Sequence, residues 1–394
     1  MTILSLPIAG FSLSPRMKPS LKKSHGQAGW SFKSSRVKAF LTRTGGHLAP
    51  VVFKLGRKSV QPFSITPWAK EPLPADLPTM LRIARGDFFC VPFGGNATPY
   101  RGERHPAHGE TANRDWTFES LDCAGGTTTL HTSMRTRARR GRVDKRLILR
   151  DGHAAVYSEH VLSGMSGPMC IGTHPMLLFP DQPGAGAITT SAFKRGFVVP
   201  TAWEKPEAKG YSLLKPGAPF SSLERVPAAA GGSLDLSLYP ARRGFEELVE
   251  VISDARLPFA WSAVTLPGAG YMFFQLKNPR VLRETVLWFS NGGRHYPPWN
   301  GRHVNVVGVE EVTSFFHLGL AESAKPNLLT RAGGPTAVQL RPDRPLRVAH
   351  ILALAAIPRG FDAVNSIVPA KGGVTLVSRS GRKVFAPLDL DFVM

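Results

Sequence analysis

Two histidines, a glutamate, an asparagine and an arginine lie within twelve residues, in the stretch HPAHGETANRDW at positions 105–116. The glycine-rich sequence VPFGGN, residues 91–96, comes shortly before it. Imidazoles and carboxylates exchange protons near neutral pH, and Gly109, directly after His108, permits a ligand to approach the backbone closely. The stretch is therefore either a polar loop or one part of an acid–base site whose other groups lie further along the chain.

Adjacent carboxylates interrupt an apolar strand in VVGVEEVTSFF, residues 306–316. In an alternating strand Glu310 shares one face with Gly308, and Glu311 shares the other with Val307 and Val309. A carboxylate on an apolar face is costly unless it is paired, hydrogen-bonded or protonated. Two interpretations remain: an exposed strand end with both glutamates solvated, or a general base in a cleft whose pKa is tuned by partial burial.

Histidines elsewhere leave similar alternatives open. His174 lies in GTHPMLLFP, residues 172–180, directly before an apolar strand. It is either a hydrogen-bonded turn residue or an acid–base group. His105, His108 and Glu110 could converge on a metal ion, but no further histidine or cysteine follows at a spacing typical of zinc sites. We therefore expect no metal.

Taken in order, these motifs resemble the aldose 1-epimerase, or galactose mutarotase-like, superfamily. The residues that carry the resemblance are His108-Gly109 followed by Trp116, His174 before an apolar strand, and Glu310 in a valine-rich strand. The separations, 66 residues between the two histidines and 136 from the second histidine to the glutamate, are of the kind that the family shows. The spacing of HG to the tryptophan is closest to the branch with glucose-6-phosphate epimerases, and the resemblance covers about residues 40–358.

The resemblance implies an isomerase that interconverts the α and β anomers of an aldose or aldose derivative by opening and reclosing the sugar ring. Glu310 is then the base that takes the proton of the C1 hydroxyl, His174 the acid that protonates the ring oxygen, and His108 a second polarising group. One acid and one base on opposite sides of the anomeric centre suffice, so no cofactor is implied. A carboxylate that contacts sugar hydroxyls in the family, between the second histidine and the glutamate, has no match in this sequence.

Four further residues are candidates for hydroxyl contacts and for stacking on the apolar face of a sugar: Asn96, Arg114, Trp116 and Trp288. The expected partner is a small-molecule sugar or a sugar phosphate, because arginine suits bidentate phosphate contacts. A non-catalytic carbohydrate-binding protein of the same fold is the alternative function.

Short strand-like runs separated by turn residues must position these groups. The hairpin signal Asp151-Gly152 joins two such runs, and Ser233–Pro240 alternates strictly between leucine and other residues. The best helical pattern covers Gly244–Ala255. With many strands and hardly any alternation of strand and helix, we predict an all-β fold, a large antiparallel β-sandwich or barrel, and the resemblance implies the galactose mutarotase-like sandwich.

The charge distribution predicts a tail. The net charge is +21, no Asp or Glu precedes Glu71, and the first 70 residues contain twelve Lys and Arg. We expect residues 1–38 to form a basic, disordered tail and residues 39–394 to form one mutarotase-like domain. A second basic cluster, residues 134–142, lacks interleaved aromatics, so we favour a solvated surface over a nucleic-acid or anionic-surface site.

The cysteines and the apolar runs bear on the compartment. Cys90, Cys123 and Cys170 are odd in number and widely spaced, which suits neither a disulfide framework nor a zinc site. A reducing compartment, the cytoplasm, fits this pattern. The apolar run at 351–358 is too short to span a bilayer, so no membrane partner is expected.

Overall fold

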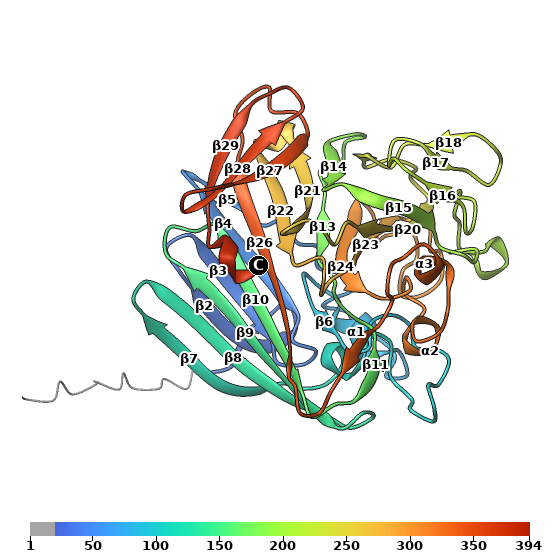
Figure 1. Ribbon diagram of the computed structural model, residues 1–394, viewed down its shortest axis with the longest axis horizontal. Helices are drawn as coiled ribbons and strands as arrows, with labels where there is room; N and C mark the ends of the chain where they lie inside the picture. The colour runs from blue at the N-terminus through green and yellow to red at the C-terminus, as the bar shows by residue number, and fades with distance from the viewer. Residues whose placement is uncertain (1–19) are drawn as a thin grey trace, which may run out of the picture.

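Strands dominate the computed structural model, which describes residues 20–394 (Figure 1). Its helices are short: α1 (Thr79–Ile83), α2 (Leu320–Ser323), α3 (Leu328–Arg331) and the 3₁₀ turns η1 (Glu110–Ala112), η2 (Pro206–Ala208), η3 (Pro267–Ala269) and η4 (Leu390–Phe392). The predicted all-β, antiparallel fold is confirmed. Within the described residues, no helix is both long and apolar enough to cross a membrane.

Two large antiparallel sheets form the body of the molecule. The nine-stranded sheet runs in the order β19 (Leu238–Tyr239), β14 (Gly186–Thr190), β21 (Ala260–Leu266), β22 (Tyr271–Lys277), β26 (Leu346–Ala356), β10 (Ala155–Ser163), β9 (Gly141–Arg150), β8 (Thr127–Thr136) and β7 (Thr117–Ala124). The predicted hairpin at Asp151-Gly152 joins β9 and β10, as the pairing of Tyr157 with Ile148 shows.

The eight-stranded sheet carries the site described below. Its order is β16 (Pro219–Phe220), β15 (Phe193–Val198), β20 (Phe245–Ser253), β23 (Glu284–Asn291), β24 (Val306–Thr313), β12 (Ile171–Thr173) and β6 (Phe89–Cys90), with β13 (Met176–Leu178) also paired to β24. All of β20, β23 and β24 is buried apart from partly exposed Phe245, which explains their long apolar runs.

Strand β26 shows how the layers pack. Leu352 and Leu354 belong to the main core, which they share with Leu287 and Val309 of the eight-stranded sheet. The alternate residues, among them Ile351, pack into a second core on the outer side. Both faces of the strand are therefore covered, so its apolar run 351–358 reflects burial within a sheet.

Four smaller sheets complete the fold. They are β1 (Lys22–Ser24), β2 (Gln27–Lys33), β3 (Val37–Thr42), β4 (Leu48–Leu55) and β5 (Lys58–Val60); β11 (Gly167–Met169) with β25 (Val338–Leu340); β17 (Val226–Pro227) with β18 (Ser233–Leu234); and β27 (Val364–Ala370), β28 (Gly373–Ser378) and β29 (Lys383–Pro387). The last of these covers the outer face of the nine-stranded sheet through the second core.

Two sequence-based expectations need correction. The expected tail, residues 1–38, lies partly outside the described residues, but residues 22–33 form β1 and β2 and Trp30 is buried in the core. The helix expected at Gly244–Ala255 is strand β20 instead, paired on one side with β15 and on the other with β23. Its glutamates are buried in hydrogen-bond networks, so no exposed helical face exists.

Candidate active site

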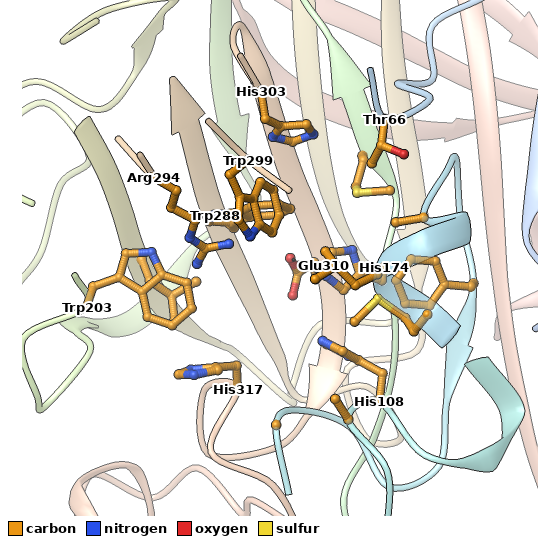
Figure 2. A pocket seen from close by; sticks show the side chains of 18 residues that line it. Thr66, His108, His174, Trp203, Trp288, Arg294, Trp299, His303, Glu310 and His317 are labelled. Atoms are coloured by element: carbon orange, nitrogen blue, oxygen red, sulfur yellow. Dashed lines mark ion pairs between the residues drawn. The ribbon is translucent and has the colours of Figure 1, made fainter. Parts of the chain in front are cut away.

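A pocket of about 210 Å³ lies on the face of the eight-stranded sheet that points away from the nine-stranded sheet. Leu248, Trp288, Gly308 and Met176 occupy one row across β20, β23, β24 and β13, and three of them line the pocket. Figure 2 labels these lining residues: Thr66, His108, His174, Trp203, Trp288, Arg294, Trp299, His303, Glu310 and His317.

His174 and Glu310 are in direct contact in this pocket, because His174 Nε2 lies 3.2 Å from Glu310 Oε1. The backbone N–H of His174 donates to the carbonyl of Phe88 and to the carboxylate of Asp87. The imidazole stacks on the Phe88 ring, with the centroids 4.6 Å apart and the planes at 16°. These contacts fix the ring so that Nε2 points at the carboxylate.

Phe88 also stacks on a second imidazole on its other side. The centroids of His47 and Phe88 are 4.3 Å apart, with the planes at 17°. His47 Nε2 is 3.1 Å from the carbonyl oxygen of Ala112. The three rings of His47, Phe88 and His174 therefore form one stack behind the pocket.

Burial controls the protonation of the His174–Glu310 pair. It raises the pKa of the Glu310 carboxyl well above its usual range, and the nearby Glu250 raises it further. Burial also lowers the pKa of His174 well below its usual range, and His108 adds to this effect. Both directions favour the uncharged forms. One proton is shared between the two residues. It lies on Glu310 in the uncharged pair and on His174 in the ion pair, so each form has one proton donor and one proton acceptor.

His108 completes the predicted group of three. Its ring centroid lies 5.0 Å from that of His174, nearly edge-on. Burial lowers the pKa of His108 to about 4, so its ring is neutral near pH 7. Cys90 Sγ lies 3.4 Å from Nδ1 of His108, and burial raises the pKa of this thiol, which keeps its proton. The thiol can donate to Nδ1 of His108 or to the carbonyl of Phe88, 3.9 Å away. When it donates to Nδ1, the ring proton lies on Nε2, where it is available to a ligand.

The opposite side of the pocket contains Arg294 among three tryptophans (Figure 2). The guanidinium carbon lies 4.5 Å from the ring centroid of Trp299, 5.1 Å from that of Trp203 and 5.4 Å from that of Trp288. Trp288, the one predicted aromatic contact that lines the pocket, donates from Nε1 to Glu246 at 3.0 Å. Aromatic faces and a cation are suited to the C–H faces and the hydroxyls of a sugar.

Two more histidines line this side. His303 stacks on Trp288, with the centroids 5.5 Å apart and the planes at 11°, and His317 meets the Trp203 ring edge-on. Burial, followed by the charge of Arg294, lowers the pKa of His303 to about 3. Burial lowers the pKa of His317 to about 3 as well. Both rings are neutral at pH 7.

Three predicted substrate contacts lie outside the pocket lining. Asn96 donates from Nδ2 to the carbonyls of Gly94 and Pro106 and accepts from the N–H of Leu320, so its side chain joins two loops. The structure gives it no position facing a ligand in this pocket.

Arg114 and Trp116 are likewise absent from the lining. Arg114 forms an ion pair with Glu110, at 2.6 Å. Trp116 is buried and donates from Nε1 to the carbonyl of Thr111. Residue type and proximity to the HG motif suggested contacts with a ligand, but both side chains are held by protein groups.

The metal alternative is not supported by the geometry. His105 binds Glu103, whereas Glu110 binds Arg114 and accepts from the N–H groups of residues 137 and 138. Within residues 20–394, no group of three or more His, Cys, Asp or Glu side chains is arranged to hold a metal ion.

Comparison with solved structures identifies the architecture. A candidate aldose 1-epimerase from Escherichia coli K12 superposes with a TM-score of 0.56 at 12% identity, covering 84% of this chain and 100% of that protein. A galactose mutarotase-like protein from Clostridium acetobutylicum gives 0.54 at 12% identity, over 86% and 98% of the two chains. The chain has the galactose mutarotase-like fold. A galactose mutarotase related enzyme from Lactobacillus acidophilus gives 0.52 at 11% identity, over 84% and 99%.

Sequence comparisons assign no activity to this chain. No protein-family model matches the chain, and no curated protein matches it by sequence. Identities this low establish the fold alone, so the activity must be argued from the site.

Part of this pocket was not among the residues predicted from the sequence. Arg294, Trp299 and His303 lie in the aromatic-rich stretch at 287–303, from which only Trp288 was selected. Their density of aromatic and basic groups was an available signal. Trp203 and His317 come from loops without any motif, and only the fold brings them to the pocket.

Proposed function

We propose that the protein is an isomerase that interconverts the α and β anomers of an aldose, with Glu310 and His174 as the proton-exchanging groups. The observation that supports it most is their 3.2 Å contact at the base of an aromatic pocket. The C1 hydroxyl and the ring oxygen of an aldose are bonded to the same carbon. Two neighbouring groups can therefore serve both atoms at once, although we had expected them on opposite sides of the anomeric centre.

The reaction balances without a net proton. The step uses the ion-pair form of the two residues: the Glu310 carboxylate takes the proton of the C1 hydroxyl and the His174 imidazolium donates a proton to the ring oxygen. The bond between C1 and the ring oxygen breaks at the same time, which gives an open-chain aldehyde. Rotation about the C1–C2 bond exposes the other carbonyl face, and the reverse transfers close the ring. Each positioned acid or base contributes roughly 10²- to 10⁴-fold in rate. The neutral Nε2–H of His108 stabilises negative charge that develops on an oxygen.

Anomer-exchange NMR tests the proposal. Exchange between the α and β signals of aldoses and hexose phosphates should accelerate with the protein, and Glu310→Gln should abolish the acceleration. Glu224→Gln, the same chemical change at an exposed residue paired with Arg379, is the matched control and should retain it. Unchanged exchange across the whole panel would contradict the proposal.

A non-catalytic sugar-binding protein is the second candidate, because three tryptophans line the pocket. Calorimetric sugar binding with no change in anomer exchange would identify this function. For the location we propose the cytoplasm, because Cys90, Cys123 and Cys170 are all free thiols.

A further inference from the structure

Arg294 is held at the pocket wall by two carboxylates from different parts of the chain. Its Nε donates to Glu204 Oε1 at 2.6 Å, and the same Nε lies 3.9 Å from Glu246 Oε2. Within the described residues, the side chain of Arg294 donates its hydrogen bond to the protein through Nε. The terminal nitrogens therefore remain available on the side that lines the pocket (Figure 2).

Neighbouring residues hold the carboxylate of Glu204 in place. Tyr296 donates its hydroxyl to Glu204, at 3.2 Å from Oε2. Residue 210 forms a bridge with Arg294, and a side chain in place of Gly210 would overlap Oε2 of Glu204. The side chain of Glu204 is only 7% exposed. Such enclosure indicates a specific ion pair in place of a chance surface contact.

Three hydrogen bonds hold the carboxylate of Glu246 in place. Its carboxylate accepts from Trp288 Nε1 at 3.0 Å, from Ser290 Oγ at 2.9 Å and from the N–H of Gly293 at 3.2 Å. Burial raises its pKa to about 7, although Arg294 opposes that shift. Near neutral pH this carboxyl therefore contributes a charge of either zero or minus one to the pocket.

The charges around the pocket consequently sum to zero or to one negative. Arg294 is the sole lining residue in the described chain with a permanent positive charge, and Glu204 cancels it. The lining histidines are neutral, and the His174–Glu310 pair has no net charge in either of its states. Moving a phosphate or a carboxylate from water into such a site is costly, because no uncompensated cation receives it.

We propose that Arg294 donates hydrogen bonds to the hydroxyls of a sugar, that Glu204 neutralises its charge in advance, and that the pocket selects uncharged aldoses over sugar phosphates and uronates. The inference rests on the proposed function for the presence of a sugar in this pocket. It adds a specificity residue, Arg294, and a residue that sets its charge, Glu204. A neutral hydroxyl can still accept a hydrogen bond from Arg294 when Glu204 balances the charge of the guanidinium. An anionic group gains little electrostatic attraction from the same guanidinium.

Tryptophan fluorescence provides the measurement, since Trp203, Trp288 and Trp299 surround Arg294. The full chain is titrated with D-galactose and with its anionic analogues, D-galacturonate and D-galactose 6-phosphate. We expect the neutral sugar to bind at least about tenfold more tightly than either anion. Glu204→Gln keeps the size of the side chain but frees the charge of Arg294, so it should strengthen anion binding about tenfold.

Tyr296→Phe is the matched control, because it removes a contact to Glu204 without changing any charge. It should leave the preference for the neutral sugar intact. Tighter binding of either anion by the unsubstituted protein would overturn the inference while leaving the proposed isomerase in place. A neutral preference without faster anomer exchange would support the inference and contradict the isomerase. Absence of binding by all three sugars would overturn both.

Discussion

Glu310 and Glu311 are neighbours in the chain, yet their carboxylates lie on opposite faces of β24 in different environments. Glu310 contacts His174 in the pocket. Glu311 points between the two large sheets, where it pairs with Lys277 and accepts from Ser262, Gln275 and Thr285. Alternation along the strand thus places one carboxylate in the pocket and the other in the core.

Substitution of these two residues should change the free energy of unfolding by very different amounts. Glu311→Gln leaves the 1%-exposed ammonium of Lys277 without its counter-charge, which should cost about 3–5 kcal/mol in the free energy of unfolding. Glu310→Gln removes a buried ionisable group without orphaning a charge, so we expect little or no loss of stability. Urea unfolding of both variants measures the difference. Equal destabilisation by the two substitutions would contradict the assignment.

Gly308 should be required for activity although it performs no chemistry. A methyl group at this position would overlap Oε1 of Glu310, the atom that contacts His174. Since the end of the Glu310 side chain can move aside, Gly308→Ala should misplace the carboxylate with little loss of stability. We expect kcat to fall about 10²-fold. Anomer-exchange rates at saturating sugar, together with the melting temperature, test this, and an unchanged kcat would refute it.

The thiol of Cys90 should determine which nitrogen of His108 carries the proton. In Cys90→Ala the donor to Nδ1 is lost, so the two neutral tautomers should mix, whereas Cys90→Ser keeps an O–H donor. The ¹⁵N chemical shifts of His108 report the tautomer directly, and they do so whether or not the protein is an enzyme. Identical shifts in the alanine variant and the parent protein would show that the thiol has no such role.

Buried imidazoles should make the fold sensitive to acid. Burial lowers the folded-state pKa of four histidines to about 3 or 4: His47, His108, His303 and His317. The unfolded chain binds these protons from pH 6.5 downwards, so the stabilisation they provide is complete above pH 6.5 and declines as the pH falls. Each group contributes roughly 1.4 kcal/mol per pH unit over this range.

Buried carboxyls act in the opposite sense, and the pKa of Glu250, Glu284 and Glu310 is raised well above its usual range by burial. Burial raises the pKa of Glu246 and Glu247 to about 7, so their contribution is complete below pH 4.5 and declines as the pH rises towards 7. The free energy of unfolding should therefore fall gently between pH 6.5 and 4.5, and steeply below pH 4.5, where only the histidines still act. Urea titrations at several pH values test this, and a stability that rises on acidification would contradict it.

Four residues selected from the sequence line the pocket, two of them in strands (Glu310 and Trp288) and two in turns or loops (His108 and His174). Glu310, His174 and His108 were found because their types and separations match a known pattern, and Trp288 because it lies in an aromatic-rich strand. Residue type alone does not say where a side chain points, so Asn96 was selected although its amide joins two loops.

The ion pairs of Arg294 could not be predicted, because they join it to carboxylates 90 and 48 residues earlier, Glu204 and Glu246. The segment that contains Glu246 was also assigned to a helix, since its leucine and valine spacing fits a helical period. Strand β20 is buried on both faces, so its apolar residues need not alternate with polar ones. Without that alternation, the sequence pattern could not distinguish the strand from a helix.

The stack of Phe88 between His47 and His174 separates the His174–Glu310 pair from the imidazole of His47. A hydrocarbon ring neither donates nor accepts a proton, so it interrupts what would otherwise be a chain of imidazoles leading into the interior. Exchange of the proton shared by His174 and Glu310 is then directed towards the pocket, where His108 and a bound molecule lie. An isomerisation that returns every proton it borrows needs no other connection, and such insulation keeps the pair in the same state from one turnover to the next.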